Sequence, residues 1–214
     1  MGLTLFDGYF QGAQRAWDVL QWTLAYPHIK TGTFWALAID NFHSRSKLEL
    51  KVLFKIFEHE LDKVREDSLF DLHQIRLKFI GRTSMFPQPI QDKMARAEEF
   101  TENFKNKTMN VALCYSGQSE IVDAAKRFAG DVACGKVKAE NVDERAFKDY
   151  LYADFPDPDL IIRTGGQHRL SGFLSYQSAY SELYFTPKYW PELTQQDLAN
   201  AIDFYDSTQR NFGK

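Results

Sequence analysis

Cysteine is scarce in this chain, and long apolar runs are absent from it. Of the 214 residues only Cys114 and Cys134 are cysteines, and their spacing matches no metal-binding pattern. No segment approaches the roughly 18 apolar residues that cross a bilayer, and the first residues lack the basic and apolar segments of a secretion signal. These features favour a cytoplasmic protein, and the apolar surroundings of Cys114 indicate an ordinary buried thiol.

The chain also lacks an excess of either charge, with 26 basic against 29 acidic side chains and a net charge of -3. This balance argues against a broadly basic surface, so nucleic acid is not expected as a partner. Hydrophobic residues make up 44% of the sequence and aromatic residues 15%, which at this length is enough for one large core. Because no repeat or low-complexity linker divides the sequence, residues 1–214 are predicted to form a single α/β domain.

Apolar segments of strand length alternate with amphipathic helical segments along most of the chain. The predicted strands span residues 33–39, 75–80, 109–114 and 159–163, and the predicted helices span residues 12–26, 46–65, 87–104, 118–133, 143–151 and 194–205. This alternation indicates a mostly parallel central β-sheet flanked by helices. Ligands in such sheets bind at the carboxyl ends of the strands, where Asn41, Ser116, Gly117 and the segment Arg163–Gly166 are expected to lie.

The densest group of chemically useful side chains follows the predicted strand at 159–163. Arginine matches phosphate oxygens with two parallel hydrogen bonds, glycine lets the backbone approach a ligand, and a serine hydroxyl adds a neutral donor. A pyrophosphate site and a surface loop closed by ion pairs account for these residue types about equally well. The residues are Arg163, Gly165, Gly166, His168, Arg169 and Ser171, followed by the carboxylate of Glu182.

The order of the residues in this segment is more informative than its composition. The run D-L-I-I-R-T-G-G-Q-H-R-L-S, followed by A-Y-S-E-L-Y-F, closely resembles the C-terminal signature of cis-prenyltransferases, the undecaprenyl diphosphate synthase family. Further matches lie at residues 39–45, 80–84 and 110–117, so that the resemblance runs in order over nearly the whole chain. The resemblance implies the family fold, with a hydrophobic tunnel, and the condensation of isopentenyl diphosphate with an allylic prenyl diphosphate to give a polyprenyl diphosphate. The helices that carry Trp17, Trp22, Phe54 and Phe57 would flank this tunnel, although these aromatic side chains fit an ordinary core equally.

The resemblance also implies a role for each matching residue. The side chains of Arg163, Arg169 and Ser171, with Gly165 and Gly166, would hold isopentenyl diphosphate. His168 and Glu182 would help to place Mg²⁺ between the substrates. Asn41 would position the substrates and take part in removing the proton after condensation, Arg45 would steady the leaving diphosphate, and Phe42 stands at a substrate-binding position where the family often has tryptophan.

Each of these residues also has a simpler interpretation. Asn41 is typical of a turn at the end of a strand, and Arg163 is compatible with a structural ion pair. Glu182 is compatible with a surface carboxylate, and His168 with a solvated loop histidine.

The family's opening motif, M-D-G-N-x-R-W-A, is missing from the printed sequence. Its aspartate carries magnesium, and residues 1–13 instead resemble the segment that follows the motif. We expect that the sequence lacks the family's first strand and loop, and that the 214-residue chain alone is inactive, because the metal would be lost from the leaving group.

Several other positions depart from the family pattern, mostly on the side of the allylic substrate. They are Leu5, Tyr9, Gln118, Gln167, Gly172 and Asn211. These departures favour an atypical substrate or acceptor, or alternatively a non-catalytic subunit of a heteromeric cis-prenyltransferase. The family resemblance implies a homodimer, with a heteromer as the alternative, and at most a peripheral membrane contact during release of a lipid product.

Overall fold

The computed structural model describes residues 5–152 and 155–209, so Asn211 and the first four residues lie outside the description. The chain divides into two compact units. Unit 1 comprises Met1–Ile29, Asp157–Ser171 and Gln177–Lys214, and unit 2 comprises Lys30–Pro156 and Gly172–Tyr176.

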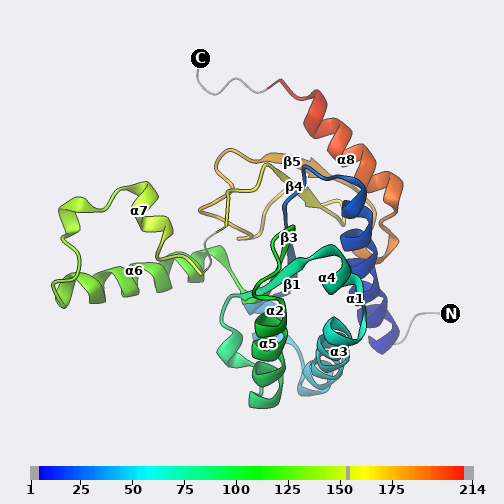
Figure 1. Ribbon diagram of the computed structural model, residues 1–214, viewed down its shortest axis with the longest axis horizontal. Helices are drawn as coiled ribbons and strands as arrows, with labels where there is room; N and C mark the ends of the chain where they lie inside the picture. Colours follow the sequence, from blue (N-terminus) through cyan, green and yellow to red (C-terminus); the bar gives the residue numbers. More distant parts are fainter. Residues whose placement is uncertain (1–4, 153–154, 210–214) are drawn as a thin grey trace. The chain divides into compact units, whose positions relative to one another are not determined.

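Unit 2 is built on a three-stranded parallel sheet (Figure 1). Its strands are β1 (Thr31–Ala38), β2 (Ile75–Ile80) and β3 (Lys107–Tyr115), in the spatial order β1-β3-β2. The register pairs Ala38 with Tyr115, so β1 and β3 end at the same edge of the sheet. Parallel strands need crossover connections, and helices provide them here.

The crossover from β1 to β2 runs through α2 (Ile39–Ser44), α3 (Lys47–Glu66) and α4 (Leu69–His73), and α5 (Gln88–Thr101) links β2 to β3. Ser46 caps α3 in a reciprocal capping box with Glu49. Helix α5 also covers the free edge of β2. The side chain of Glu98 accepts a 2.7 Å hydrogen bond from the Phe79 N–H, and Thr101 accepts one of 3.0 Å from the Leu77 N–H. These bonds satisfy edge donors that would otherwise invite pairing with another chain.

After β3, the long helix α6 (Gly117–Ala133) extends away from the sheet of unit 2, and α7 (Glu144–Lys148) folds back beside it (Figure 1). Ring contacts of Tyr150 with Phe128 and Phe147 hold this helical arm together. Only the first half of α6 contributes buried side chains, which end at Ala124.

Unit 1 contains a second parallel pair of strands, β4 (Leu160–Arg163) and β5 (Glu182–Phe185), with α1 (Leu5–Trp22) and α8 (Gln195–Ser207). The Trp190 indole N–H donates to the carbonyl of Gly12 at 2.8 Å and so ties α1 to the loop before α8. Thr194, the residue at which this helix is predicted to start, caps α8 in a reciprocal capping box with Asp197.

The predicted α/β class and the parallel strands flanked by helices are confirmed. Within residues 5–152 and 155–209, five strands are hydrogen-bonded as two sheets, one in each unit. The sequence missed β5, which is only four residues long, and the short helices α2 and α4. Helix α1 begins at Leu5 and not at residue 12. The low helix propensity of Gly8 and Gly12 argues against a helix at its first turns, but these glycines do not end it. The single domain and the hydrophobic tunnel stay predictions.

Within residues 5–152 and 155–209, none of the helices combines the length and the apolar character that a membrane span requires.

Candidate functional site

The carboxyl end of β4 carries the predicted anion-binding cluster. The Arg163 guanidinium donates a 2.9 Å hydrogen bond to the hydroxyl of Ser171. Burial, together with the positive charge of Arg169, lowers the pKa of Arg163. The structure thus brings Arg163, Arg169 and Ser171 together, and an anion bound there would relieve the repulsion between the two guanidinium groups.

Neither arginine of this cluster forms an ion pair with a carboxylate within the part of the chain that the structure describes. Arg169 donates instead to the neutral side chain of Gln167, at 2.5 Å. Gln167 stands where the family has glutamate, so this position does not neutralise the cluster. The interpretation of Arg163 as half of a structural ion pair is therefore not supported.

The paired glycines shape the turn that follows β4. Gly165 and Gly166 have φ angles of +86° and +70°, a region that side-chain-bearing residues rarely adopt. Their N–H groups donate to the carbonyls of Lys188 and Thr186, at 2.8 and 3.0 Å. Because these amides already have acceptors, the glycines set the path of the backbone in this conformation and do not offer free donors to a ligand.

His168 is an exposed loop residue whose ring lies flat against an aromatic side chain. Its ring stacks on Phe185 with centroids 4.7 Å apart and an interplanar angle of 2°. Phe185 is the residue of β5 that pairs with Arg163, so His168 lies at the carboxyl end of the strand pair.

Glu182 lies at the other end of the same strands. It begins β5, pairs with Leu160, and its N–H donates to the carbonyl of Asp159 at 2.9 Å. Along the strand Phe185 is three residue positions further on, which corresponds to roughly 10 Å. Glu182 and the ring stack of His168 on Phe185 thus lie toward opposite ends of the strand pair, and a joint role in metal binding stays a prediction.

Across the described ranges, no group of three potential ligands among histidine, cysteine, aspartate and glutamate converges as a metal site would require. Magnesium binding by this chain stays a prediction.

The remaining predicted residues lie in unit 2, just beyond the carboxyl end of β1. Asn41 is exposed in α2, and its carbonyl accepts the Arg45 N–H at 3.1 Å, where the helix ends. The simple turn predicted for Asn41 is thus a short helix. Phe42 contacts Phe54 and Phe86 at ring-centroid distances of 6.4 and 6.2 Å, as part of an aromatic cluster.

Sequence reasoning assigned no role to a polar network at the same edge of this sheet. Arg82 binds both carboxylate oxygens of Asp123, at 2.9 and 3.0 Å, and the Tyr152 hydroxyl donates to Asp123 at 2.6 Å. The hydrogen bond from Arg82 lowers the pKa of Asp123. Nearby, Tyr115 donates a 2.5 Å hydrogen bond to Glu120, and both side chains are fully buried. The signal for this network was Glu120, a carboxylate close to the start of an otherwise amphipathic helix.

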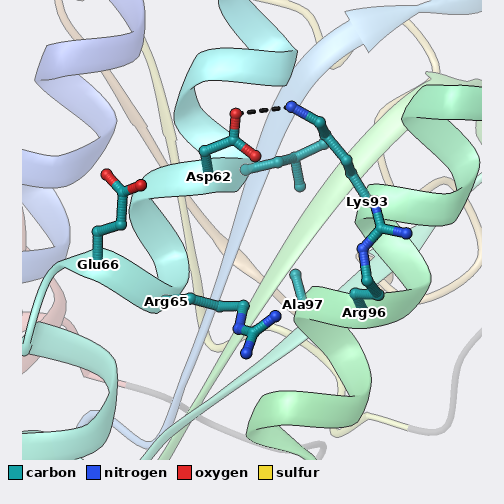
Figure 2. Close-up of a pocket in the computed structure, with 7 residues that line it drawn as sticks. Asp62, Arg65, Glu66, Lys93, Arg96 and Ala97 are labelled. Atoms are coloured by element: carbon teal, nitrogen blue, oxygen red, sulfur yellow. Dashed lines mark hydrogen bonds and ion pairs between the residues drawn. The ribbon is translucent and has the colours of Figure 1, made fainter.

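A separate groove of about 340 Å³ lies between α3 and α5 (Figure 2). Charged side chains dominate its walls, and Asp62 and Lys93 face each other across it in a 2.6 Å ion pair. An isoprenoid chain requires an apolar lining, so this groove is not the predicted tunnel. It contains none of the predicted site residues.

The comparisons with known proteins agree over almost the full length of the chain. The family model described as "Putative undecaprenyl diphosphate synthase" matches residues 1–213. The tritrans,polycis-undecaprenyl-diphosphate synthase (geranylgeranyl-diphosphate specific) of Thermoplasma volcanium is 40% identical over 215 residues, with coverage of 100% of this chain and 83% of that protein. The protein of the same name from Methanopyrus kandleri is 39% identical over 215 residues, with coverage of 100% and 79%.

Two solved structures are similar as well. The lavandulyl diphosphate synthase of Lavandula x intermedia, in complex with dimethylallyl diphosphate, has a TM-score of 0.92 at 34% identity and covers 100% of this chain and 91% of its own. A probable undecaprenyl diphosphate synthase from Campylobacter jejuni has a TM-score of 0.81 at 29% identity, with coverage of 95% and 92%. The chain therefore belongs to the undecaprenyl diphosphate synthase family and is a prenyltransferase.

Proposed function

We propose that this protein condenses isopentenyl diphosphate with an allylic prenyl diphosphate and releases a longer prenyl diphosphate. The observation that carries the proposal is the hydrogen bond between Arg163 and Ser171 beside Arg169, in a cluster whose two positive charges lack a carboxylate partner among the described residues. Two guanidinium groups and a hydroxyl provide paired donors for phosphate oxygens. The names of the archaeal relatives support geranylgeranyl diphosphate as the allylic substrate.

The reaction requires two things of the residues. Ionisation of the allylic diphosphate develops negative charge on the departing pyrophosphate, which cationic donors stabilise. Arg45 is the candidate for this role. Isopentenyl diphosphate must meanwhile be held with its double bond against the allylic carbon, so that positioning supplies much of the rate. We assign that task to Arg163, Arg169 and Ser171, and the positioning of the reacting groups to Asn41 and Phe42.

We also propose that the reaction requires Mg²⁺, as is generally expected in this family, and that the ion screens diphosphate charge. Glu182 and His168 remain the candidates for contact with it, each separately. Titration of Mg²⁺ in the assay tests this, because Glu182→Gln should raise the concentration needed for half-maximal rate. An unchanged titration would make Glu182 a structural residue.

We also propose that the protein is a homodimer in the cytoplasm, and sedimentation equilibrium of the purified protein tests its oligomeric state.

The central experiment measures steady-state kinetics of Arg163→Ala. The KM for isopentenyl diphosphate should rise at least tenfold because a charged hydrogen bond to phosphate is lost, while the melting temperature stays within about 2 °C. Arg65→Ala, which removes an exposed arginine from α3, is the matched control and should leave the KM unchanged. An unchanged KM for Arg163→Ala would remove the phosphate assignment.

The assay is run on the 214-residue chain and on the same chain preceded by the strand and loop that carry the family aspartate. We expect turnover only in the second case. If neither form turns over until a second prenyltransferase subunit is added, the non-catalytic subunit is the better description.

A second candidate substrate is dimethylallyl diphosphate acting as acceptor. The similarity to a synthase in complex with that molecule, at a TM-score of 0.92, favours it. Mass spectrometry of products formed from dimethylallyl diphosphate alone, and from geranylgeranyl plus isopentenyl diphosphate, separates the two. A ten-carbon product from the first mixture only would replace chain elongation with a single condensation.

A further inference from the structure

Helix α2, which carries Asn41, is too short to be stable by itself. It has six residues, and its N-cap, Ala38, provides no side-chain hydrogen bond to the first turn. Isolated helices of this length do not persist in water, so α2 depends on packing against other elements. Its first residue, Ile39, is 7% exposed and supplies one such contact with the core.

Phe42 attaches α2 at a second place. Its ring contacts the rings of Phe54 in α3 and of Phe86, with centroids 6.4 and 6.2 Å apart. Phe42 directly follows Asn41 in the chain, and Asn41 is exposed. The position of the exposed Asn41 side chain therefore depends on where the contacts of Phe42 hold the helix.

Phe86 lies at the centre of this aromatic cluster. Besides Phe42, its ring contacts those of Phe54 and Phe57, at centroid distances of 5.4 and 5.5 Å. Phe86 is 3% exposed, so the cluster is closed to water at its centre. Aromatic pairs at such distances stabilise by more than their buried area alone. Phe86 therefore joins α2 to α3.

The backbone of Phe86 is itself fixed between β2 and α5. Its N–H donates to the carbonyl of Thr83 at 3.0 Å, and its carbonyl accepts a 2.6 Å hydrogen bond from the side chain of Gln91 in α5. Helices α2, α3 and α5 and the whole cluster belong to unit 2. Phe86 thus provides a fixed surface on which Phe42, and with it α2, packs.

We propose that Phe86 is a positioning residue for the reaction: through the ring of Phe42 it fixes α2 and so the side chain of Asn41. This inference rests on the proposed function, in which Asn41 positions the reacting groups. A small displacement of a group that orients the reactants slows the chemical step, so loss of the Phe86 ring should lower kcat. The KM for isopentenyl diphosphate should hardly change, because that substrate is assigned to the arginine cluster after β4.

The test measures kcat and the KM for isopentenyl diphosphate in Phe86→Ala, using the catalytically active form of the protein. We expect kcat to fall about tenfold or more, with the KM changed less than about twofold. A role in stability alone would lower the melting temperature without this selective loss of kcat.

Phe70→Ala is the matched control. Phe70 is 1% exposed in α4, which leads into the amino end of β2 and so lies at the opposite edge of the sheet from α2. Its truncation should lower the melting temperature about as much as Phe86→Ala, because each leaves a cavity in the core, and should leave kcat unchanged. An equal loss of kcat in the two variants would overturn the inference.

A double-mutant cycle tests whether Phe86 acts through Asn41. If it does, Phe86→Ala should lower kcat by less than about threefold in the Asn41→Ala background, because the side chain that it positions is already gone. Fully additive losses would overturn the inference, and so would a folded Phe86→Ala protein with unchanged kcat.

If Phe86→Ala does not fold, Phe86→Leu decides the question, since it removes the ring but keeps most of the buried volume. A loss of kcat of about threefold or more at unchanged KM would support the inference, and an unchanged kcat would overturn it. Failure of the proposed function is distinguishable, because Asn41→Ala would then leave kcat unchanged. If only the present inference fails, Asn41→Ala still lowers kcat and Phe86→Ala does not.

Discussion

Gly81 occupies a position where any other residue would distort the backbone. It follows β2 with a φ angle of +108°, and a Cβ atom there would lie 2.1 Å from the Leu113 carbonyl oxygen. Gly81→Ala therefore forces a backbone shift at the carboxyl edge of the sheet and should cost about 2–4 kcal/mol. Urea unfolding monitored by circular dichroism measures this cost.

The control for that experiment is Gly130→Ala near the end of α6. A Cβ atom at Gly130 would meet no neighbouring atom within 4 Å, and the backbone there is helical. Alanine should stabilise the helix at this position by roughly 0.5–1 kcal/mol. Equal losses at both glycines would show that the close contact at Gly81 is not what matters.

The two cysteines should react very differently. Cys114 is 0% exposed and burial raises its pKa to about 12, so hardly any reactive thiolate forms at neutral pH. Cys134 is exposed at the end of α6. An aromatic disulfide reagent at pH 8 should titrate one thiol in the native protein and two in denaturant. Two rapid native equivalents would contradict the burial of Cys114.

At the scale of residues, the residue types predicted most members of the anion-binding cluster after β4, but they did not predict its geometry. Arginine, arginine and serine near a strand end indicate an anion site, and the structure brings Arg163, Arg169 and Ser171 together. The pairing of the glycine amides with residues 186–188 could not be predicted, because those acceptors follow twenty residues later and depend on how β5 aligns with β4.

Helix α8 carries an acid-sensitive contact at its first turn. Lys188 donates to Asp197 at 2.7 Å, and this bond, together with one from Thr194, lowers the pKa of Asp197 to about 2. A carboxyl whose folded pKa lies below its unfolded value of 3.8 stabilises the fold above about pH 4 and loses that contribution as the pH falls towards 2.

The variant Lys188→Met should therefore flatten this part of the acid-stability profile. Its melting temperature should fall less between pH 4 and pH 2 than that of the unaltered protein, although it starts slightly lower. Lys126→Met is the control, because the exposed Lys126 lies 4.0 Å from Asp123 and is the smallest of the causes that lower the pKa of this carboxyl, so the slope should change little. If the melting temperatures of Lys188→Met and the unaltered protein fell by the same amount between pH 4 and pH 2, the contact between Lys188 and Asp197 would not account for the acid sensitivity.

At the scale of elements, local signals predicted best where they are strong. The helices predicted over residues 46–65 and 194–205 begin, in the structure, directly after Ser46 and Thr194, which cap them. Strand β5 and helix α2 were missed because elements of four and six residues hold too few periodic positions to exceed the background. Their existence depends on pairing and packing partners that lie far away along the chain.

For the molecule as a whole, residues 172–176 show why contacts between distant parts of the chain could not be predicted from the sequence. These five residues belong to unit 2, whereas the segments before and after them belong to unit 1. Neither hydrophobic periodicity nor the residue types of turns can predict that so short a segment packs in the other unit. The core cluster that contains Tyr115 and Leu174 joins residues more than fifty positions apart, so it could only be found in the fold.

A ligand of the arginine cluster should stabilise the entire folded protein. Binding to the native state alone adds about 2.7 kcal/mol when the ligand is present at one hundred times its dissociation constant. For a chain of this length such a gain corresponds to roughly 5–10 °C in melting temperature. Addition of inorganic pyrophosphate, monitored by scanning calorimetry, should produce this shift.

The shift in melting temperature should shrink as the salt concentration rises, because charge attraction contributes to binding. Arg163→Ala should abolish most of it, while Arg65→Ala should retain it. A shift of equal size in Arg163→Ala would mean that pyrophosphate binds elsewhere, and the anion site at the end of β4 would have to be abandoned.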